Sequence, residues 1–158
     1  MTTLVLTLTL LLAATAAQHP AHHPDDVTRR GDAVMGFPHD KTTHHFRQRA
    51  SGGEIEITAN DPRNEESAGA IGSHLRHIAR MFGDGDFTAP LLIHARNPPG
   101  TGVMAARKQA ITYVVESVAG GARLRITTGD RDALDAIHEF LRFQITDHRT
   151  GDPLTIQK

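Results

Sequence analysis

An internal duplication constrains the fold of this 158-residue chain more than any other feature of its sequence. GGEIEIT at 52–58 corresponds to GGARLRIT at 120–127, and AIGSHLRHI at 70–78 corresponds to AIHEFLRFQI at 136–145. In each copy a glycine pair begins a run of alternating apolar and polar residues, which indicates a hairpin strand. Apolar residues at helical spacing follow. The chain therefore contains two copies of a β-β-α unit.

The two copies are predicted to form one α+β domain over residues 42–153, with the units at 42–83 and 110–148. Two hairpins and two helices make an antiparallel sheet with the two helices on one face. Asn60 or Asp61 is expected to cap the first helix, and the apolar run between the units reads as a short strand or extended piece.

The ends of the chain read differently from the domain. Residues 1–17 are apolar and then small, which is typical of a secretory signal peptide, and the run is shorter than the ~20 residues that span a bilayer. We expect a periplasmic or secreted protein without a membrane span after cleavage, an uncleaved anchor being the alternative. Residues 18–41 are predicted to be a His/Pro-rich disordered lead-in, and 154–158 a tail.

The composition excludes several classes of function. The chain has no cysteine, so disulfides and thiolate metal sites are impossible. Its formal net charge is −1, with one tyrosine and no tryptophan, which argues against nucleic-acid binding. Eleven histidines are the unusual feature, and they direct attention to metal chemistry.

Aligning the two predicted helices pairs histidines of the first copy with phenylalanines of the second: His74 with Phe140, and His77 with Phe143. At ~100° per residue, His74, His77 and Met81 fall along one flank of the first helix. Imidazole and thioether together suit copper, with zinc as the other candidate. Alternatively, the histidines fill aromatic-sized gaps and hydrogen-bond to nearby groups.

Strand alternation separates the adjacent histidines of the motif TTHHF. His44 is predicted to point inward with Phe46, toward the histidine flank of the first helix, whereas His45 points to the opposite face. His44 is therefore a candidate ligand, and the pair cannot chelate one ion together. His94, beside a Pro-Pro-Gly turn, is either a further ligand or a strand-end residue.

Three other histidines have interpretations of their own. Cleavage after Ala16 would place His19 third in the mature chain, where a free amine, two backbone nitrogens and the imidazole suit Cu(II). Cleavage after Ala17 removes this possibility and leaves a His-rich tail. His138 lies in HEFLR, which lacks the second histidine of a zinc-protease motif. His148 is expected to be a cationic imidazole at a helix C-terminus.

The motifs TTHHF, LLIHARNPPGTGVM and AIHEFLRFQITDHRTGDP resemble a family of small secreted bacterial proteins with no established activity, over roughly residues 30–153. Some members of that family carry a carbamoyltransferase label. The Ser-Thr-Arg-Thr phosphate loop of such enzymes is missing from this sequence, so the resemblance implies no catalytic activity here.

Three hypotheses follow. The first is an exported protein that binds copper or zinc through His44, His74, His77, Met81 and His94. The second is a non-catalytic accessory module that binds an envelope protein or a second copy through the polar face of its sheet. The third, a histidine-dependent enzyme, is less favoured because no catalytic motif is complete.

Overall fold

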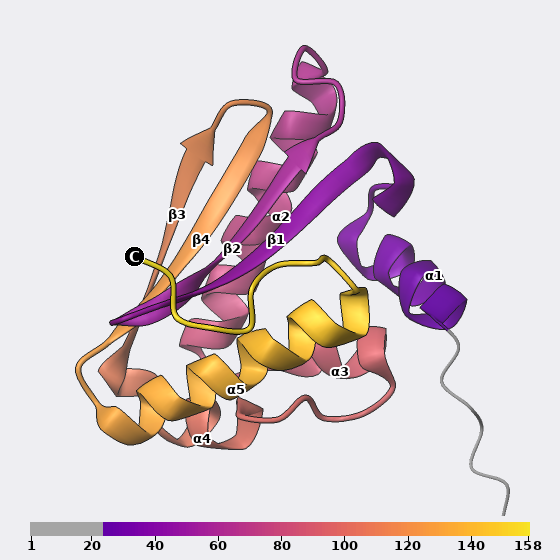
Figure 1. Cartoon of the computed structure of the whole chain (residues 1–158). Helices are drawn as coiled ribbons and strands as arrows, with labels where there is room; N and C mark the ends of the chain where they lie inside the picture. The colour runs from indigo at the N-terminus through magenta and orange to yellow at the C-terminus, as the bar shows by residue number, and fades with distance from the viewer. Residues whose placement is uncertain (1–23) are drawn as a thin grey trace, which may run out of the picture.

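The computed structural model describes residues 24–158 and confirms the predicted α+β class. Its four strands are β1 (Thr42–Arg49), β2 (Gly52–Ala59), β3 (Ile111–Val118) and β4 (Gly121–Thr128). They form one antiparallel sheet in the order β1-β2-β4-β3 (Figure 1). The long helices α2 (Glu65–Gly83) and α5 (Arg131–His148) follow the two hairpins, as the duplication predicts.

The two faces of the sheet differ in polarity because side chains alternate along each strand. Phe46 pairs with Ile55, which pairs with Leu124, and this row is buried beneath the helices. The next row, which begins with Arg47 and Glu54, faces the other side. Helix α2 packs mainly on β3 and β4, and α5 mainly on β1 and β2. Burial of each large apolar side chain in this core contributes roughly 1.5–3 kcal/mol.

The second strand of each hairpin opens with a glycine that the sheet requires. A Cβ at Gly52 would collide with the carbonyl of Ile126, and a Cβ at Gly121 would collide with the carbonyl of Ile57. The two positions are equivalent, because each glycine pairs with the last residue of the preceding strand and lies beside the strand of the other unit. A Cβ at the next residue, Gly53, would collide with the side chain of Leu141 and the carbonyl of Arg47. At these glycines the sheet leaves no room for a side chain.

Helix α5 begins as its sequence suggests, with Asp130 accepting a hydrogen bond from Ala133 N. The predicted cap of α2 was wrong. Asn64, rather than Asn60 or Asp61, accepts the bond from the third residue along, Ser67. The two earlier side chains are engaged elsewhere, since Asn60 binds β1 and its preceding turn, and Asp61 accepts from the Arg63 backbone.

The segment between the two units is helical, which corrects the prediction of a strand. It contains α3 (Thr88–His94) and α4 (Thr101–Ala106), followed by the short 3-10 helix η2 (Lys108–Ala110). A short apolar run cannot be assigned to strand or helix from periodicity alone. Here α3 packs against α1 and α4 packs against α5, with Ala89 and Met104 buried, instead of pairing with the sheet.

The lead-in is also more ordered than its composition suggests. Residues 24–35 form α1 (Pro24–Met35), and His39–Lys41 form the 3-10 helix η1. Val27 and Phe37 are buried, and Arg30 Nε donates to the carbonyl of Ile93 in α3 at 2.7 Å. A few apolar residues, too sparse to give a periodic signal, are enough to dock this helix. Residues 1–23, including the predicted signal peptide and His19, lie outside the described part of the chain.

The C-terminal segment lies along the free edge of β1. Gln157 forms a parallel bridge with Arg49, and its N–H donates to the carbonyl of Gln48 at 2.9 Å. The Gln48 side chain, buried in the domain, donates to the carbonyl of Leu154. One edge of the sheet is thus covered by the chain itself. Within residues 24–158, no helix is long and apolar enough to cross a bilayer.

Candidate functional site

Four imidazoles surround one apolar cavity of about 70 Å³ between the helices and β1. They come from four separate elements: His44 from β1, His74 from α2, His94 from α3 and His148 from the end of α5. Met35, the last residue of α1, lines the same cavity. The structure therefore brings together three of the predicted ligands, His44, His74 and His94, and adds two residues that the sequence did not suggest.

His44 lies at the centre of this group. As predicted, it points inward with Phe46, while His45 points to the other face and contacts Asp152. His44 Nε2 lies 3.3 Å from the sulfur of Met35. Its ring is parallel to that of His148, with the ring centroids 6.4 Å apart and the planes inclined by 1°.

A second, more polar cavity of about 280 Å³ shares the lining residues Met35, His44 and His148 with the first. Helix α1 and the start of β1 form most of its wall. Its other lining residues are mainly hydroxyl-bearing or small: Val27, Thr28, Gly31, His39, Thr42, Thr43 and Thr150. The contact between His44 and Met35 can therefore be reached from a space large enough for a small molecule.

The predicted stripe on α2 does not act as one unit. His74 is half-buried, lines the apolar cavity and meets the ring of Phe37 edge-on at 5.6 Å. His77 is exposed, and Met81 is half-buried but does not line the cavity. An i, i+3, i+7 spacing gives three side chains a common flank, but the cavity meets that flank only at its inner margin. His77 and Met81 as ligands remain an untested prediction.

His94 is fully buried in a polar network that ties α3 to α5. Its Nδ1 lies 2.5 Å from the Asp147 carboxylate, and its Nε2 lies 3.0 Å from the Gln144 amide oxygen. Asp147 also accepts from Arg96 at 3.0 Å. Burial opposes ionisation of Asp147, but the hydrogen bond from His94 and the charge of Arg96 outweigh it and lower the pKa of the carboxyl. Both nitrogens of His94 are engaged, which argues for a structural role.

Three of the cavity imidazoles, those of His44, His74 and His148, have a lowered pKa and are uncharged at neutral pH. Burial, followed by the neighbouring imidazoles, lowers the pKa of His44 and of His74 to about 4. The same causes lower the pKa of His148 to about 3. The expectation of a cationic His148 at the helix end was wrong, because desolvation outweighs the attraction of the helix dipole. Each neutral ring keeps one nitrogen lone pair available for a ligand.

His138 has a structural role. Its Nε2 lies 2.9 Å from the carbonyl of Arg49 and 3.0 Å from that of Gly52, so one N–H is shared between the two ends of the first hairpin turn. The ring is buried. This contact anchors the hairpin to α5, and it agrees with the exclusion of a zinc-protease motif.

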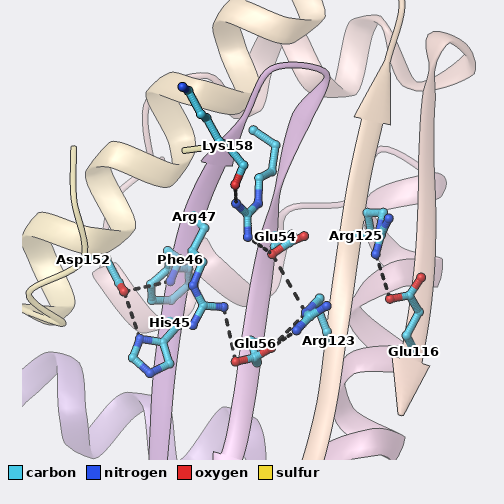
Figure 2. A network of polar contacts seen from close by, with 11 residues as sticks. His45, Phe46, Arg47, Glu54, Glu56, Glu116, Arg123, Arg125, Asp152 and Lys158 are labelled. Atoms are coloured by element: carbon cyan, nitrogen blue, oxygen red, sulfur yellow. Dashed lines mark hydrogen bonds and ion pairs between the residues drawn. The ribbon is translucent and has the colours of Figure 1, made fainter. Parts of the chain in front are cut away.

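The outer face of the sheet, opposite the buried row that meets α2 and α5, carries interlocking ion pairs (Figure 2). Arg123 Nε donates to Glu56 at 2.8 Å, and Arg47 lies 3.2 Å from the same carboxylate. The other pairs of the face are Arg49 with Glu54 at 2.9 Å and Arg125 with Glu116 at 3.0 Å. Because acids and bases alternate across the strands, this face presents neither a basic nor an acidic patch.

Two residues of the cavity were missed from the sequence for different reasons. Met35 lies in the segment predicted to be a disordered lead-in, where no apolar period marks a helix. His148 was assigned to a helix end, whereas the fold brings it against β1, 104 positions from His44. Among residues 24–158, no group of three or more His, Asp or Glu side chains is arranged to hold a metal ion.

Comparison with family models, with curated proteins and with solved structures finds no match to this chain.

Proposed function

We propose that this protein binds a soft transition-metal ion, with Cu(I) favoured, through the imidazole of His44 and the thioether of Met35. The observation that carries the proposal is the separation of 3.3 Å between His44 Nε2 and Met35 Sδ. His74 and His148, which line the same cavity, are the candidates for further ligands.

The separation fits shared coordination of one ion. With metal–nitrogen and metal–sulfur bonds of roughly 2.0 and 2.3 Å, a ligand angle of about 100° places the two donor atoms about 3.3 Å apart. Both atoms could therefore reach one ion with little movement of the backbone. The same distance also suits a weak hydrogen bond from Nε2–H to sulfur. Metal titration distinguishes a coordination site from this hydrogen bond.

The ligand chemistry favours copper over hard cations. Neutral imidazole and thioether are ligands of soft ions, whereas calcium, magnesium and manganese prefer carboxylate and carbonyl oxygens. None of the described residues that line either cavity is a carboxylate. Because the ring of His44 is already neutral at pH 7, an ion would not have to displace a proton from its cationic form.

The test is competition for Cu(I) between the mature protein and a chromophoric chelator under anaerobic conditions. Met35→Leu and His44→Phe should each weaken binding at least tenfold. Met81→Leu and His77→Ala are the matched controls and should bind as the parent does. His19→Ala in every variant removes the possible N-terminal Cu(II) site from the comparison.

Each outcome decides between ligand sets. Failure of the parent to bind Cu(I) stoichiometrically would refute the proposal. Loss of binding in Met81→Leu and His77→Ala, with Met35→Leu unaffected, would restore the ligand set expected from the sequence. Zinc titration in parallel tests the other candidate ion, which a site of two or three neutral ligands should bind more weakly than Cu(I).

A further inference from the structure

Of the two edges of the sheet, one is covered by another segment of the chain and the other has no strand paired to it within residues 24–158. The edge of β1 is covered by the C-terminal segment through the bridge between Arg49 and Gln157. The other edge is β3, which pairs with β4 on its inner side only; no other described segment pairs with it (Figure 1). Along eight residues, half of the backbone N–H and C=O groups of β3 therefore point away from the sheet.

The sequence of β3 lacks the devices that keep an edge strand unpaired. Exposed edges are usually blunted by lysine, proline, a bulge or a short strand. The strand ITYVVESV at Ile111–Val118 has none of these, and its single charge is Glu116. Val114, near the middle of the strand, is 45% exposed.

We infer that β3 pairs with β3 of a second copy of this chain, antiparallel about a two-fold axis at Val114, to make one continuous eight-stranded sheet. The inference is independent of metal binding.

The register about Val114 is self-complementary. Val114 would lie opposite Val114 of the second copy, and Tyr113 opposite Val115 of the second copy. Pairs of β-branched residues, and of an aromatic with a β-branched residue, stabilise neighbouring strands. Glu116 falls opposite Thr112 of the second copy, so no like charges meet directly across the axis. The ion pair between Glu116 and Arg125 would remain within each copy of the chain.

The helix layer fits the same symmetry. Helix α2 lies over β3 and β4, so its axis is about one strand spacing, roughly 5 Å, from the proposed two-fold. The two copies of α2 would then run antiparallel about 10 Å apart, at the upper end of the range for packed helices. The flank of α2 opposite His74 carries Ala68, Gly72 and Ala79, whose small side chains permit such an approach.

A partner of another kind is less well supported. A second copy satisfies the strand edge, the register and the helix spacing with one symmetry operation, as closed two-fold dimers do. A foreign strand would satisfy the edge alone. Pairing by residues 1–23 of the same chain would leave the protein a monomer, and that is an outcome of the test.

The first measurement is sedimentation equilibrium of the mature protein over a wide range of concentration. A concentration-dependent dimer is expected. Val114→Lys would place two ammonium groups beside the axis and should shift the protein to monomer. Val103→Lys is the matched control, since Val103 is 42% exposed on α4 and away from β3, and it should leave the dimer intact.

The second measurement uses the absence of cysteine from the chain. In Val114→Cys the two thiols would face each other at a Cα separation of about 4.5–5.5 Å, which a disulfide can bridge. Mild oxidation should cross-link this variant rapidly, and Val103→Cys at least tenfold more slowly. Circular dichroism of each variant checks that the fold is retained.

The inference is overturned if the parent is monomeric at every concentration. It is equally overturned if Val114→Cys cross-links no faster than Val103→Cys. A dimer that survives Val114→Lys would place the interface elsewhere on the molecule.

Discussion

Lowering the pH from 7 to 5 should destabilise the metal-free protein through its buried imidazoles. Burial lowers the pKa of His44 and His74 to about 4 and that of His148 to about 3. In the unfolded chain a histidine titrates near pH 6.5. Between these values the unfolded state binds protons that the folded state does not, so stability is lost as the pH falls below about 6.5.

The magnitude follows from the linkage relation. A group that shifts from about 6.5 to about 4 costs roughly 2 kcal/mol more at pH 5 than at pH 7. Three such groups would cost about 5–6 kcal/mol, but part of each shift is repulsion from the other imidazoles, so we expect about 3–5 kcal/mol. This is a large share of the 5–15 kcal/mol typical of a domain. The carboxyls of Asp147 and Asp152, whose pKa values are lowered, act only at lower pH.

Urea unfolding at half-unit steps between pH 5 and 7 measures the effect. His148→Phe removes one titrating imidazole, so it should flatten the pH dependence of stability by about one proton. The phenyl ring can still stack on Phe46, whose centroid lies 5.5 Å from that of His148, so the variant should retain the fold. His77→Ala, at an exposed position, is the control. Equal stability of the parent at pH 5 and pH 7 would refute the reasoning, as would equal flattening by both variants.

Four further substitutions test the packing and the C-terminal segment. His138→Phe leaves two carbonyl oxygens of the first hairpin turn without their donor, and should lower the free energy of unfolding by about 2–4 kcal/mol in urea titrations. Gly53→Ala forces a Cβ against Leu141 and should cost about 1–3 kcal/mol, whereas Gly69→Ala, where nothing lies within 4 Å, should stabilise α2 by up to about 1 kcal/mol. In thermal melts, a Gly53→Ala protein more stable than the parent, or a Gly69→Ala protein less stable than the parent, would contradict the corresponding assignment. Asp152→Ala removes the acceptor of His45 and the Phe46 N–H, and should speed carboxypeptidase trimming of the last residues; an unchanged rate would show that other contacts hold this segment.

The duplicated unit was predictable because its signals are local. Alternation along β1 and β2, the glycine pairs and the helical spacing of residues such as Ile71 and Leu75 each depend on neighbours a few positions apart. The helices α1 and α3 were not predictable in this way. The apolar residues of α1 are few, and α3 is an apolar run too short to show a period. Both helices are stabilised by docking on the domain rather than by their own periodicity.

The candidate site was predictable only in part, for the same reason. The inward orientation of His44 follows from the strand period. The second copy of the repeat has a phenylalanine, Phe140, at the position of His74, which indicated that His74 lies beside the core. The contacts of His44 with Met35 and His148 connect elements far apart in the sequence, as does the network of His94 with Asp147. No spacing rule relates such positions, because the packing of whole helices brings them together.

The use of Met35 and His148 in one cavity has a consequence for the order of assembly. These residues lie at the end of the first described helix and at the end of the last, so the cavity walls are incomplete in any nascent chain shorter than about 148 residues. The hairpins can form early from nearby residues, whereas closing the cavity requires contacts across most of the sequence. An ion bound there would not guide early folding, and it would stabilise the finished domain by mass action. Removing the chain from Thr150 onward would open the wall of the neighbouring, larger cavity, which Thr150 lines together with Met35 and His148.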